Sequence, residues 1–127
     1  MIEVQKILGK DRGVVAKQQI LKETVIEIAP VSAIPAEHLS TLDKTEVFKY
    51  YFVRPAEYDE SYLFRGYLVF GLASLCNHSD RPNAEVSWVE DEVGLWCHLI
   101  AQRDIEAGEE VTLFYTNIDE YSISKFI

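Results

Sequence analysis

The stretch Leu75-Cys76-Asn77-His78-Ser79-Asp80-Arg81-Pro82-Asn83 carries more chemical information than any other part of this sequence. Asparagine, histidine and serine stand together, and a Pro-Asn pair ends the stretch. A lone asparagine is most simply interpreted as a turn residue whose amide satisfies nearby backbone groups. The five residues Asn, His, Ser, Pro and Asn at fixed spacing are a far more specific signal, and they indicate a loop with a functional role.

Two further stretches stand on either side of this loop. After it comes Gly108-Glu109-Glu110-Val111-Thr112-Leu113-Phe114-Tyr115, a Gly-Glu-Glu turn that enters a strand ending at a tyrosine. Before it, Arg12-Gly13-Val14-Val15-Ala16 is followed by Ile20 and by Val25-Ile26-Glu27-Ile28-Ala29-Pro30-Val31. β-Branched residues favour strands, so this region is predicted to form a strand, a turn and a second strand that closes at Pro30.

The clearest local prediction is a β-hairpin. Val86 and Trp88 share one face of the incoming strand, Asp91 to Gly94 forms the turn, and Leu95 to Ala101 returns with alternating side chains. A faint internal echo links the pattern Ala16-x-x-x-Ile20 to Ala101-x-x-x-Ile105, since a strand follows each. These patterns predict a mostly β fold built from small hairpins.

Between about residues 34 and 62 the character of the chain changes. Pro35 suits the first position of a helix, and Asp43-Lys44-Thr45-Glu46 resembles a helix start. This segment is predicted to be a partly helical insert.

The three stretches together, spanning residues 10 to 116, resemble the signatures of SET domains, protein-lysine methyltransferases that use S-adenosyl-L-methionine. The resemblance implies a single domain over residues 1–127 with the mostly β, β-clip fold of several short sheets. It also implies a small, partly helical insert at about 34–62 and a tail at 116–127. In the family, the segment after the second signature threads beneath the loop of the first in a pseudoknot-like arrangement, which is rare among folds.

By the same resemblance, the reaction is methyl transfer from the cofactor to a lysine ε-amine. The Asn77 side chain would hold the amino end of the cofactor, and backbone groups around Asn77 and His78 would bind its adenine. Gly13 would let the backbone approach closely. The residues assigned to the cofactor are Arg12, Gly13, Val14, Asn77, His78, Tyr115 and Tyr121.

Catalysis is expected to rest on Tyr115 and Tyr50. A free lysine has a pKa of roughly 10.4, so its amine must lose a proton before it can attack. Desolvation and the positive sulfonium of the cofactor lower that pKa, so a strong protein base is not required. Tyr115 would position the amine, and a second channel tyrosine is expected in the insert. Tyr50 is preferred there because it resembles a tyrosine of the minimal viral-type members of the family, which precedes a Phe-x-Arg similar to Phe52-Val53-Arg54. Tyr51 is the alternative.

Charge and composition limit the partners. The 21 acidic against 12 basic residues give a net charge of -9, which disfavours direct binding to nucleic acid or to an anionic membrane. A basic, lysine-containing protein is favoured as partner, although excess acid also serves solubility alone. With no leader sequence at its start and only Cys76 and Cys97 as cysteines, the chain is expected to be intracellular and cytoplasmic, or nuclear if eukaryotic or viral.

No metal site is predicted. Cys97 and His98 are adjacent on a predicted strand and point to opposite faces, and the spacing of Cys76 and His78 fits no zinc-finger pattern. The cysteine-rich flank that binds zinc in many larger SET proteins has no counterpart after Tyr115.

Two residues depart from the family pattern. Asp11 stands where the opening turn commonly has its first glycine, and Phe114 replaces a frequent aspartate. Asp11 and the tail without a cysteine-rich flank motivate the second hypothesis, a SET-like module that has lost catalysis and binds peptides. A homodimer is also expected, because the tail carries four apolar residues, Tyr121, Ile123, Phe126 and Ile127.

Overall fold

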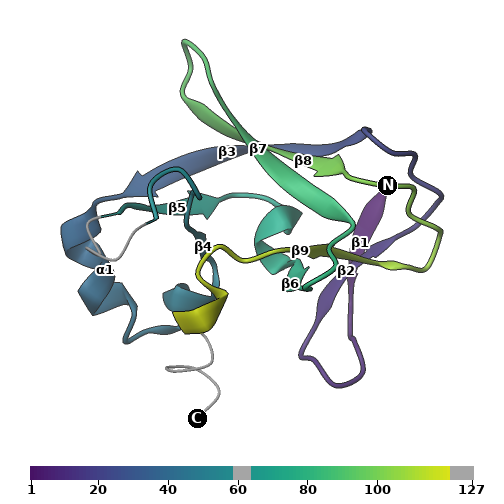
Figure 1. The fold of residues 1–127 in the computed structure, drawn as a ribbon, viewed down its shortest axis with the longest axis horizontal. Helices are drawn as coiled ribbons and strands as arrows, with labels where there is room; N and C mark the ends of the chain where they lie inside the picture. The colour runs from purple at the N-terminus through teal and green to yellow at the C-terminus, as the bar shows by residue number, and fades with distance from the viewer. Residues whose placement is uncertain (59–63, 121–127) are drawn as a thin grey trace.

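The computed structural model of the protein describes residues 1–58 and 64–120 (Figure 1). The strands are β1 (Ile2–Gln5), β2 (Gly13–Ala16), β3 (Val25–Ile34), β4 (Tyr51–Phe52), β5 (Gly66–Val69), β6 (Asn77–His78), β7 (Ala84–Glu90), β8 (Leu95–Ala101) and β9 (Glu110–Leu113). The helical segments are α1 (Ala36–Leu42) and the 3-10 turns η1 (Glu46–Lys49) and η2 (Leu72–Leu75). No described helix is long and apolar enough to cross a membrane.

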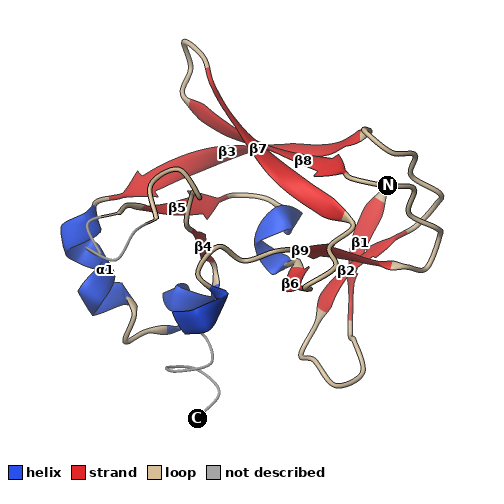
Figure 2. Cartoon of the chain, in the orientation of Figure 1, coloured by secondary structure: helices blue, strands red, loops and turns tan. Residues whose placement is uncertain are grey.

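The strands form two sheets, which confirms the prediction of a mostly β fold of short sheets. One sheet has the order β1-β2-β9-β6, in which β6 and β9 run parallel, and the other has the order β4-β5-β3-β8-β7. Figure 2 shows strands through most of the chain, with α1 and η1 gathered at one end. The two signature stretches therefore meet as neighbouring strands, because β6 belongs to the first and β9 to the second.

The main core lies where the central strands of both sheets face inward. Every residue of β2 is buried, since β1 and β9 flank it on both sides. The most deeply buried aliphatic side chains of this core are Val14, Ile20, Leu99, Ile105 and Val111. Burial of such side chains contributes about 1.5–3 kcal/mol each. The backbone beneath the asparagine–histidine loop is thus held rigidly.

The internal echo corresponds to a local two-fold arrangement centred on Ile20 and Ile105. The backbone N–H of each donates to the carbonyl of the other, both at 2.8 Å. Ala16 accepts from Gly108 at 2.8 Å, and the equivalent Ala101 accepts from Glu23 at 2.7 Å. The sequence pattern indicated two similar units, and the structure pairs them with each other.

The two-fold arrangement also places Glu23 and Gly108 in equivalent turns. Both have positive φ, 72° for Glu23 and 89° for Gly108. Glycine adopts this conformation freely, whereas a residue with a Cβ atom is strained there. Glu23 is the one non-glycine residue with positive φ in the described ranges.

The predicted end of the second strand at Pro30 is wrong. β3 continues to Ile34, because its hydrogen-bonding partner changes at the proline. Up to Pro30 the strand pairs with β8, and from Val31 it pairs with β5 along the other edge. Pro30 lacks an N–H but its carbonyl accepts from Phe70 N at 3.0 Å, so the strand tolerates the proline at this junction.

The predicted hairpin is confirmed as β7 and β8. Cys97 and Leu99 are buried in the core, whereas the alternate residues of β8 are partly exposed. The Asp91 side chain closes the turn by accepting hydrogen bonds from the N–H groups of Val93 and Gly94 and from Trp96 Nε1. These three bonds lower the pKa of Asp91.

The insert contains α1, η1 and β4, with Pro35 at the N-cap of α1. Thr45 caps η1 through its side-chain oxygen, which accepts from Val47 N at 3.2 Å, as the helix-start pattern indicated. A second cluster of buried residues forms here, and Tyr115 and Ile118 from the C-terminal segment pack against it. The cluster consists of Ile34, Leu39, Phe48, Tyr51, Val53 and Phe64. The insert is thereby joined to the segment that follows β9.

Candidate functional site

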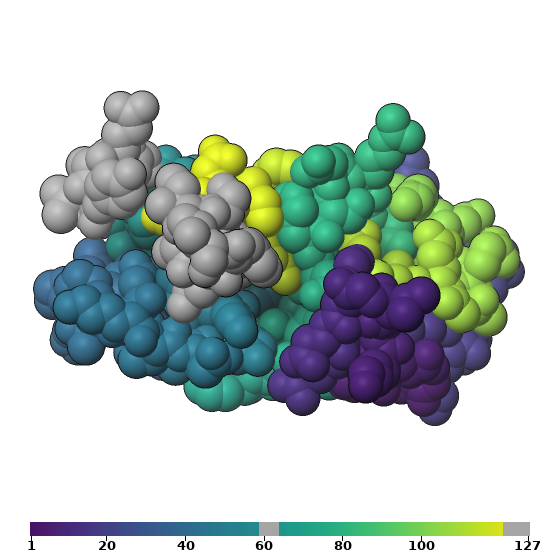
Figure 3. Space-filling model, turned by 90° about the horizontal axis from the view of Figure 1, so that it is seen from below, coloured from purple at the N-terminus to yellow at the C-terminus, as the bar shows by residue number. Residues whose placement is uncertain are grey.

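Two pockets lie on either side of Tyr115. The larger, about 380 Å³, is lined by the N-terminal turn at 9–12, by η1, and by Ser74, Leu75, Asn77 and His78. The smaller, about 260 Å³, lies between the insert and β7. Figure 3 shows the molecule from below, with the N-terminal turn in purple and the insert in blue on either side of a hollow. Lys49, Ser74 and Tyr115 line both pockets.

Asn77 is the first residue of β6 and lines the larger pocket. Its Nδ2 atom donates to the carbonyl oxygen of Arg12 at 2.9 Å and to Glu110 Oε2 at 2.8 Å. The amide therefore joins three segments that are far apart in the sequence. Arg12 itself also lines this pocket.

Gly13 is buried directly beneath this contact. A Cβ atom at this position would stand 2.6 Å from Glu110 Oε2 and 2.7 Å from Asn77 Nδ2. Both distances are well inside van der Waals contact, so only glycine lets the carboxylate and the amide meet here. Gly13, in the N-terminal stretch, is therefore required by the side chains of Asn77 and Glu110, which come from the other two stretches.

His78 holds the backbone of Tyr115 by its side chain. Its Nδ1 atom accepts from Tyr115 N at 2.9 Å, and its Nε2 atom lies 2.8 Å from Asp80 Oδ1. Nδ1 must be unprotonated to accept, so Nε2 carries the proton and donates to the carboxylate. The ring also packs against Phe114, with the centroids 4.8 Å apart.

Asn83, the last residue of the first signature, fastens the loop to β9. It is 1% exposed. Its Nδ2 atom donates to the Glu110 carbonyl at 2.8 Å and to Glu109 Oε2 at 3.2 Å, and its Oδ1 atom accepts from Thr112 N at 2.9 Å. With Ser79 N donating to the Leu113 carbonyl at 2.8 Å, the loop runs along the whole of β9. This is the packing expected of a pseudoknot-like C-terminal segment.

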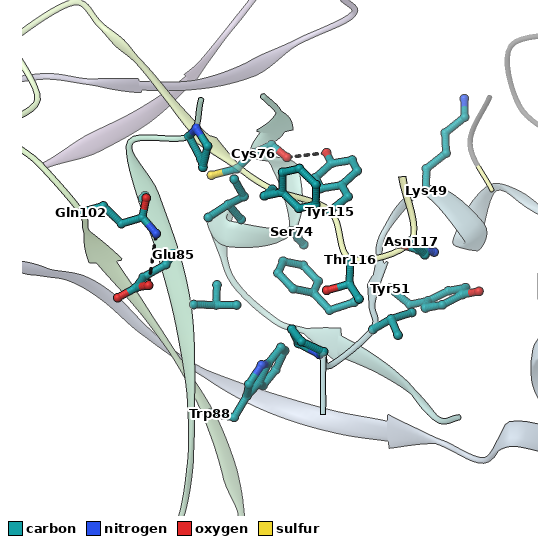
Figure 4. A pocket seen from close by; sticks show the side chains of 18 residues that line it. Lys49, Tyr51, Ser74, Cys76, Glu85, Trp88, Gln102, Tyr115, Thr116 and Asn117 are labelled. Carbon is teal, nitrogen blue, oxygen red and sulfur yellow. Dashed lines mark hydrogen bonds between the residues drawn. The ribbon is translucent and has the colours of Figure 1, made fainter. Parts of the chain in front are cut away.

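Tyr115 lies where the two pockets meet. Its hydroxyl donates to the carbonyl oxygen of Cys76 at 2.6 Å, as the dashed line in Figure 4 shows. A hydroxyl that donates its proton in this way has lone pairs left to accept an N–H from a ligand.

The two neighbouring tyrosines of the insert have different surroundings. Tyr50 lines the larger pocket and is partly exposed. Tyr51 is 3% exposed, and its hydroxyl donates to Asp43 Oδ1 at 2.8 Å. Figure 4 shows its ring directed away from Tyr115. The two tyrosines therefore face different pockets: Tyr50 lines the larger pocket, and Tyr51, whose hydroxyl is held by Asp43, lines the smaller one.

The smaller pocket is mostly apolar. Its wall includes Phe52 and Trp88, whose rings meet edge to face with centroids 5.7 Å apart. Trp88 also lies beneath the Arg54 guanidinium, 5.7 Å from its ring centre. At one end the carboxylate of Glu85 accepts from Gln102 Nε2 at 3.1 Å (Figure 4). The pocket can take an extended aliphatic chain with a polar end.

Two of the residues assigned to the cofactor from the sequence, Gly13 and Val14, do not line the larger pocket. Val14 is 0% exposed, belongs to the core and does not line the pocket. Tyr121 lies outside the described residues. Asp11 lines the pocket and does not have a positive φ, so a residue with a Cβ atom is not strained at this position of the turn.

Sequence reasoning missed two site residues, Lys10 and Glu110. Glu110 belongs to the second signature, where it looked like a turn residue before a strand, and Lys10 lies in a turn with no pattern of its own. Lys10 Nζ contacts Glu110 Oε1 at 2.9 Å. Only the pairing of β2 with β9 reveals this contact.

The two cysteines are buried and carry free thiols. Burial raises the pKa of Cys97 to about 12, and the nearby Glu27 carboxylate adds to the shift. Burial and the neighbouring carboxylates also raise the pKa of Cys76. Neither thiol is activated as a nucleophile or as a metal ligand, and the described residues contain no cluster of metal-ligating side chains.

Comparison with known sequences identifies the family. The SET domain family matches residues 11–116. The histone-lysine N-methyltransferase, H3 lysine-37 specific, of Schizosaccharomyces pombe is 29% identical over 114 residues, which cover 90% of this chain and 72% of that protein. Protein-lysine N-trimethyltransferase SMYD5 of Mus musculus is 47% identical over 47 residues, which cover 37% of this chain and 11% of that protein.

Solved structures support the same fold. The Plasmodium falciparum protein PFL0690c has a TM-score of 0.71 and 24% identity, covering 91% of this chain and 96% of its own. The Neurospora SET domain protein DIM-5, a histone lysine methyltransferase, has a TM-score of 0.66 and 20% identity, covering 91% of this chain and 52% of its own. Together with the family match over most of its length, these similarities show that the chain belongs to the SET-domain family.

Proposed function

We propose that this protein transfers a methyl group from S-adenosyl-L-methionine to a lysine side chain of a basic protein. The enzyme class, protein-lysine N-methyltransferase, follows from the family and from its relatives. One observation supports the proposal most directly: two pockets of different character meet at Tyr115, whose hydroxyl is held by the Cys76 carbonyl.

The larger pocket fits the cofactor. S-Adenosyl-L-methionine supplies a methyl group on a positively charged sulfur. Asn77 Nδ2 is engaged by two acceptors, so its Oδ1 atom is the part of the amide left to accept from an ammonium group. Arg12 and Tyr50 line the same pocket, and Gly13 leaves room for the contact between Asn77 and Glu110 beside it. Backbone groups of Asn77 and His78 are proposed to bind the adenine.

The smaller pocket fits a lysine side chain. Its apolar wall suits the four-carbon stem, and Tyr115 forms part of that wall. Transfer from water to this wall, together with a positive charge nearby, lowers the pKa of the lysine amine and favours the neutral nucleophile. The Tyr115 oxygen then accepts a hydrogen bond from the amine N–H, so that the nitrogen lone pair points at the methyl group of the cofactor. Alignment of this kind is the main contribution the protein makes.

The substrate is proposed to be a lysine-rich protein segment, a histone tail included. The S. pombe relative is named for histone H3 lysine 37, and the net charge of -9 suits a basic partner. A histone substrate would place the protein in the nucleus.

A direct assay tests the proposal. The protein is incubated with radiolabelled S-adenosyl-L-methionine and mixed basic proteins, and the products are hydrolysed to identify methylated amino acids. We expect labelled Nε-methyllysine, and we expect Tyr115→Phe to reduce kcat at least about 100-fold, as for the loss of a key positioning contact. Tyr67→Phe is the matched control, because its hydroxyl donates to Glu57 and the residue lines neither pocket. Absence of labelled lysine with every substrate would contradict the proposal.

The alternative, a SET-like peptide-binding module without catalysis, is motivated by Asp11 in the wall of the larger pocket. A carboxylate there would repel the cofactor's own carboxylate. Calorimetry separates the two functions, since the module predicts peptide binding that Tyr115→Phe does not weaken, together with no turnover.

A further inference from the structure

We infer that Glu110 is a positioning residue for the cofactor, a role that rests on the proposed use of the larger pocket. It fixes the amide of Asn77 and, through Lys10, holds the N-terminal turn at 9–12 against that pocket. No part of the reacting centre touches Glu110, so its influence passes through its two neighbours.

The carboxylate of Glu110 divides its oxygens between two segments. Oε2 accepts from Asn77 Nδ2 at 2.8 Å, and Oε1 accepts from Lys10 Nζ at 2.9 Å. The Glu110 side chain is 19% exposed and that of Lys10 is 40% exposed. A partly buried, charge-assisted pair of this kind is stronger than an exposed ion pair. Glu110 thus joins β9, β6 and the turn in one contact.

The first consequence concerns the orientation of the Asn77 amide. Its Nδ2 group faces two acceptors, Glu110 Oε2 and the Arg12 carbonyl. A flipped amide would direct Oδ1 at both of these oxygens, which is repulsive. Glu110 therefore makes Asn77 present an acceptor to the pocket, the group that an ammonium of an amino acid requires.

The second consequence concerns the turn. Its backbone changes direction at Gly9, which has a φ of 79°, and Lys10 N donates to the Ile7 carbonyl at 3.0 Å. Gly9, Lys10, Asp11 and Arg12 all line the larger pocket. Two contacts hold this wall in place: Lys10 pairs with Glu110, and the Arg12 carbonyl accepts from Asn77. Glu110 makes the first contact itself and supports the second through its hydrogen bond to Asn77.

Gly13 makes the arrangement possible. A Cβ atom there would lie 2.6 Å from the Oε2 atom through which Glu110 binds Asn77. Gly13 and Glu110 therefore act together: the glycine leaves room for the hydrogen bond between Glu110 and Asn77, and we infer that this bond affects the affinity of the pocket for the cofactor.

The test compares Glu110→Ala and Lys10→Met with Glu106→Ala as the matched control. Glu106 is an exposed acid of the same region whose carboxylate contacts Gln19 and neither pocket. The readouts are the Kd for S-adenosylhomocysteine by calorimetry and the separate KM values for cofactor and peptide. We expect Glu110→Ala to raise the Kd and the cofactor KM at least about tenfold with the peptide KM within twofold. Lys10→Met should raise them about threefold, and Glu106→Ala should leave them unchanged.

Two outcomes would overturn the inference. One is a wild-type Kd in Glu110→Ala, and the other is a parallel rise of both KM values, which a purely structural role would produce. If the wild-type protein binds no S-adenosylhomocysteine, the proposed function fails. The side-chain amide protons of Asn77, followed by NMR, then judge the positioning itself: Glu110→Ala must shift them, and unshifted resonances refute the contact.

Discussion

At the scale of single residues, the candidate site requires the absence of a side chain at Gly13 as well as the side chains around it. Gly13 lies where the three signatures meet, and the atoms around it come from Asn77, Glu110 and Ile7. All three atoms belong to side chains, so a Cβ atom at this position would require those side chains to move.

We therefore expect Gly13→Ala to impair both stability and cofactor binding. The new Cβ atom would stand less than 3 Å from three neighbours, and overpacking of this kind costs about 1–3 kcal/mol. Chemical denaturation gives the stability, and calorimetry with S-adenosylhomocysteine gives the affinity. An alanine variant with the wild-type Kd would show that the backbone can shift without disturbing Asn77.

A second residue-scale prediction uses the local two-fold arrangement. Glu23 is exposed and has a φ of 72°, whereas the equivalent position has a glycine, Gly108. Glu23→Gly should stabilise the protein by about 0.5 kcal/mol, because relief of left-handed strain exceeds the entropy that glycine adds to the unfolded chain. Gly108→Ala should destabilise it by about 1 kcal/mol. Urea denaturation of both variants checks the opposite signs, and equal signs would contradict the explanation.

At the scale of elements, the geometry proposed for catalysis depends on how the loop at 76–83 is attached to β9. His78 and Asn83 make side-chain bonds along this strand, while the Tyr115 hydroxyl bonds back to the Cys76 carbonyl. Strand and loop hold each other from both sides, and neither has a stable position alone.

Asn83→Ala should separate the two elements. The substitution removes three hydrogen bonds of a side chain that is 1% exposed and leaves Thr112 N without its acceptor. We expect a loss of about 3 kcal/mol of stability and a large fall in kcat, because Tyr115 follows β9 directly. Unfolding in urea and methyl-transfer kinetics below the transition provide the measurements. Retention of wild-type stability would mean that the backbone pairing of β6 and β9 is sufficient.

At the scale of the whole molecule, the core is formed by the inner faces of both sheets, and both thiols lie within it. Cys97 is 1% exposed and faces the same core as Leu99. Its pKa is raised from 9.0 to about 12, so the folded state holds the neutral thiol where the unfolded chain would release its proton.

The stability that this thiol confers is therefore fully present below pH 9 and is lost as the pH rises towards about 12. The expected slope is about 1.4 kcal/mol per pH unit over this window. Cys97→Ala should therefore lose less free energy of unfolding than the wild type as the pH rises, even though the variant is less stable at neutral pH. Denaturation curves from pH 8 to 11 of both proteins check this, and identical slopes would contradict it.

The local patterns of the sequence determined much of the architecture. Alternation of buried and exposed residues and a turn at Asp91 to Gly94 sufficed for the β7–β8 hairpin, because a hairpin depends on neighbours in the chain. Thr45 marked the start of η1 for the same reason. Pro30 misled, since a strand whose partner changes from β8 to β5 at the proline cannot be recognised without those partners.

The motif resemblance identified the family and named Asn77, His78 and Tyr115, because their spacing is visible along the chain. The tertiary structure decided what the motifs do to each other. Glu110 meets Asn77 over Gly13, Lys10 meets Glu110 across 100 positions, and Tyr50 rather than Tyr51 faces the larger pocket. A sequence records which side chains exist, whereas contacts between distant segments arise only when β2, β9 and β6 pair. The stretch from Leu75 to Asn83 therefore indicated which residues belong to the candidate site, and only the pairing of these strands showed how the residues contact each other.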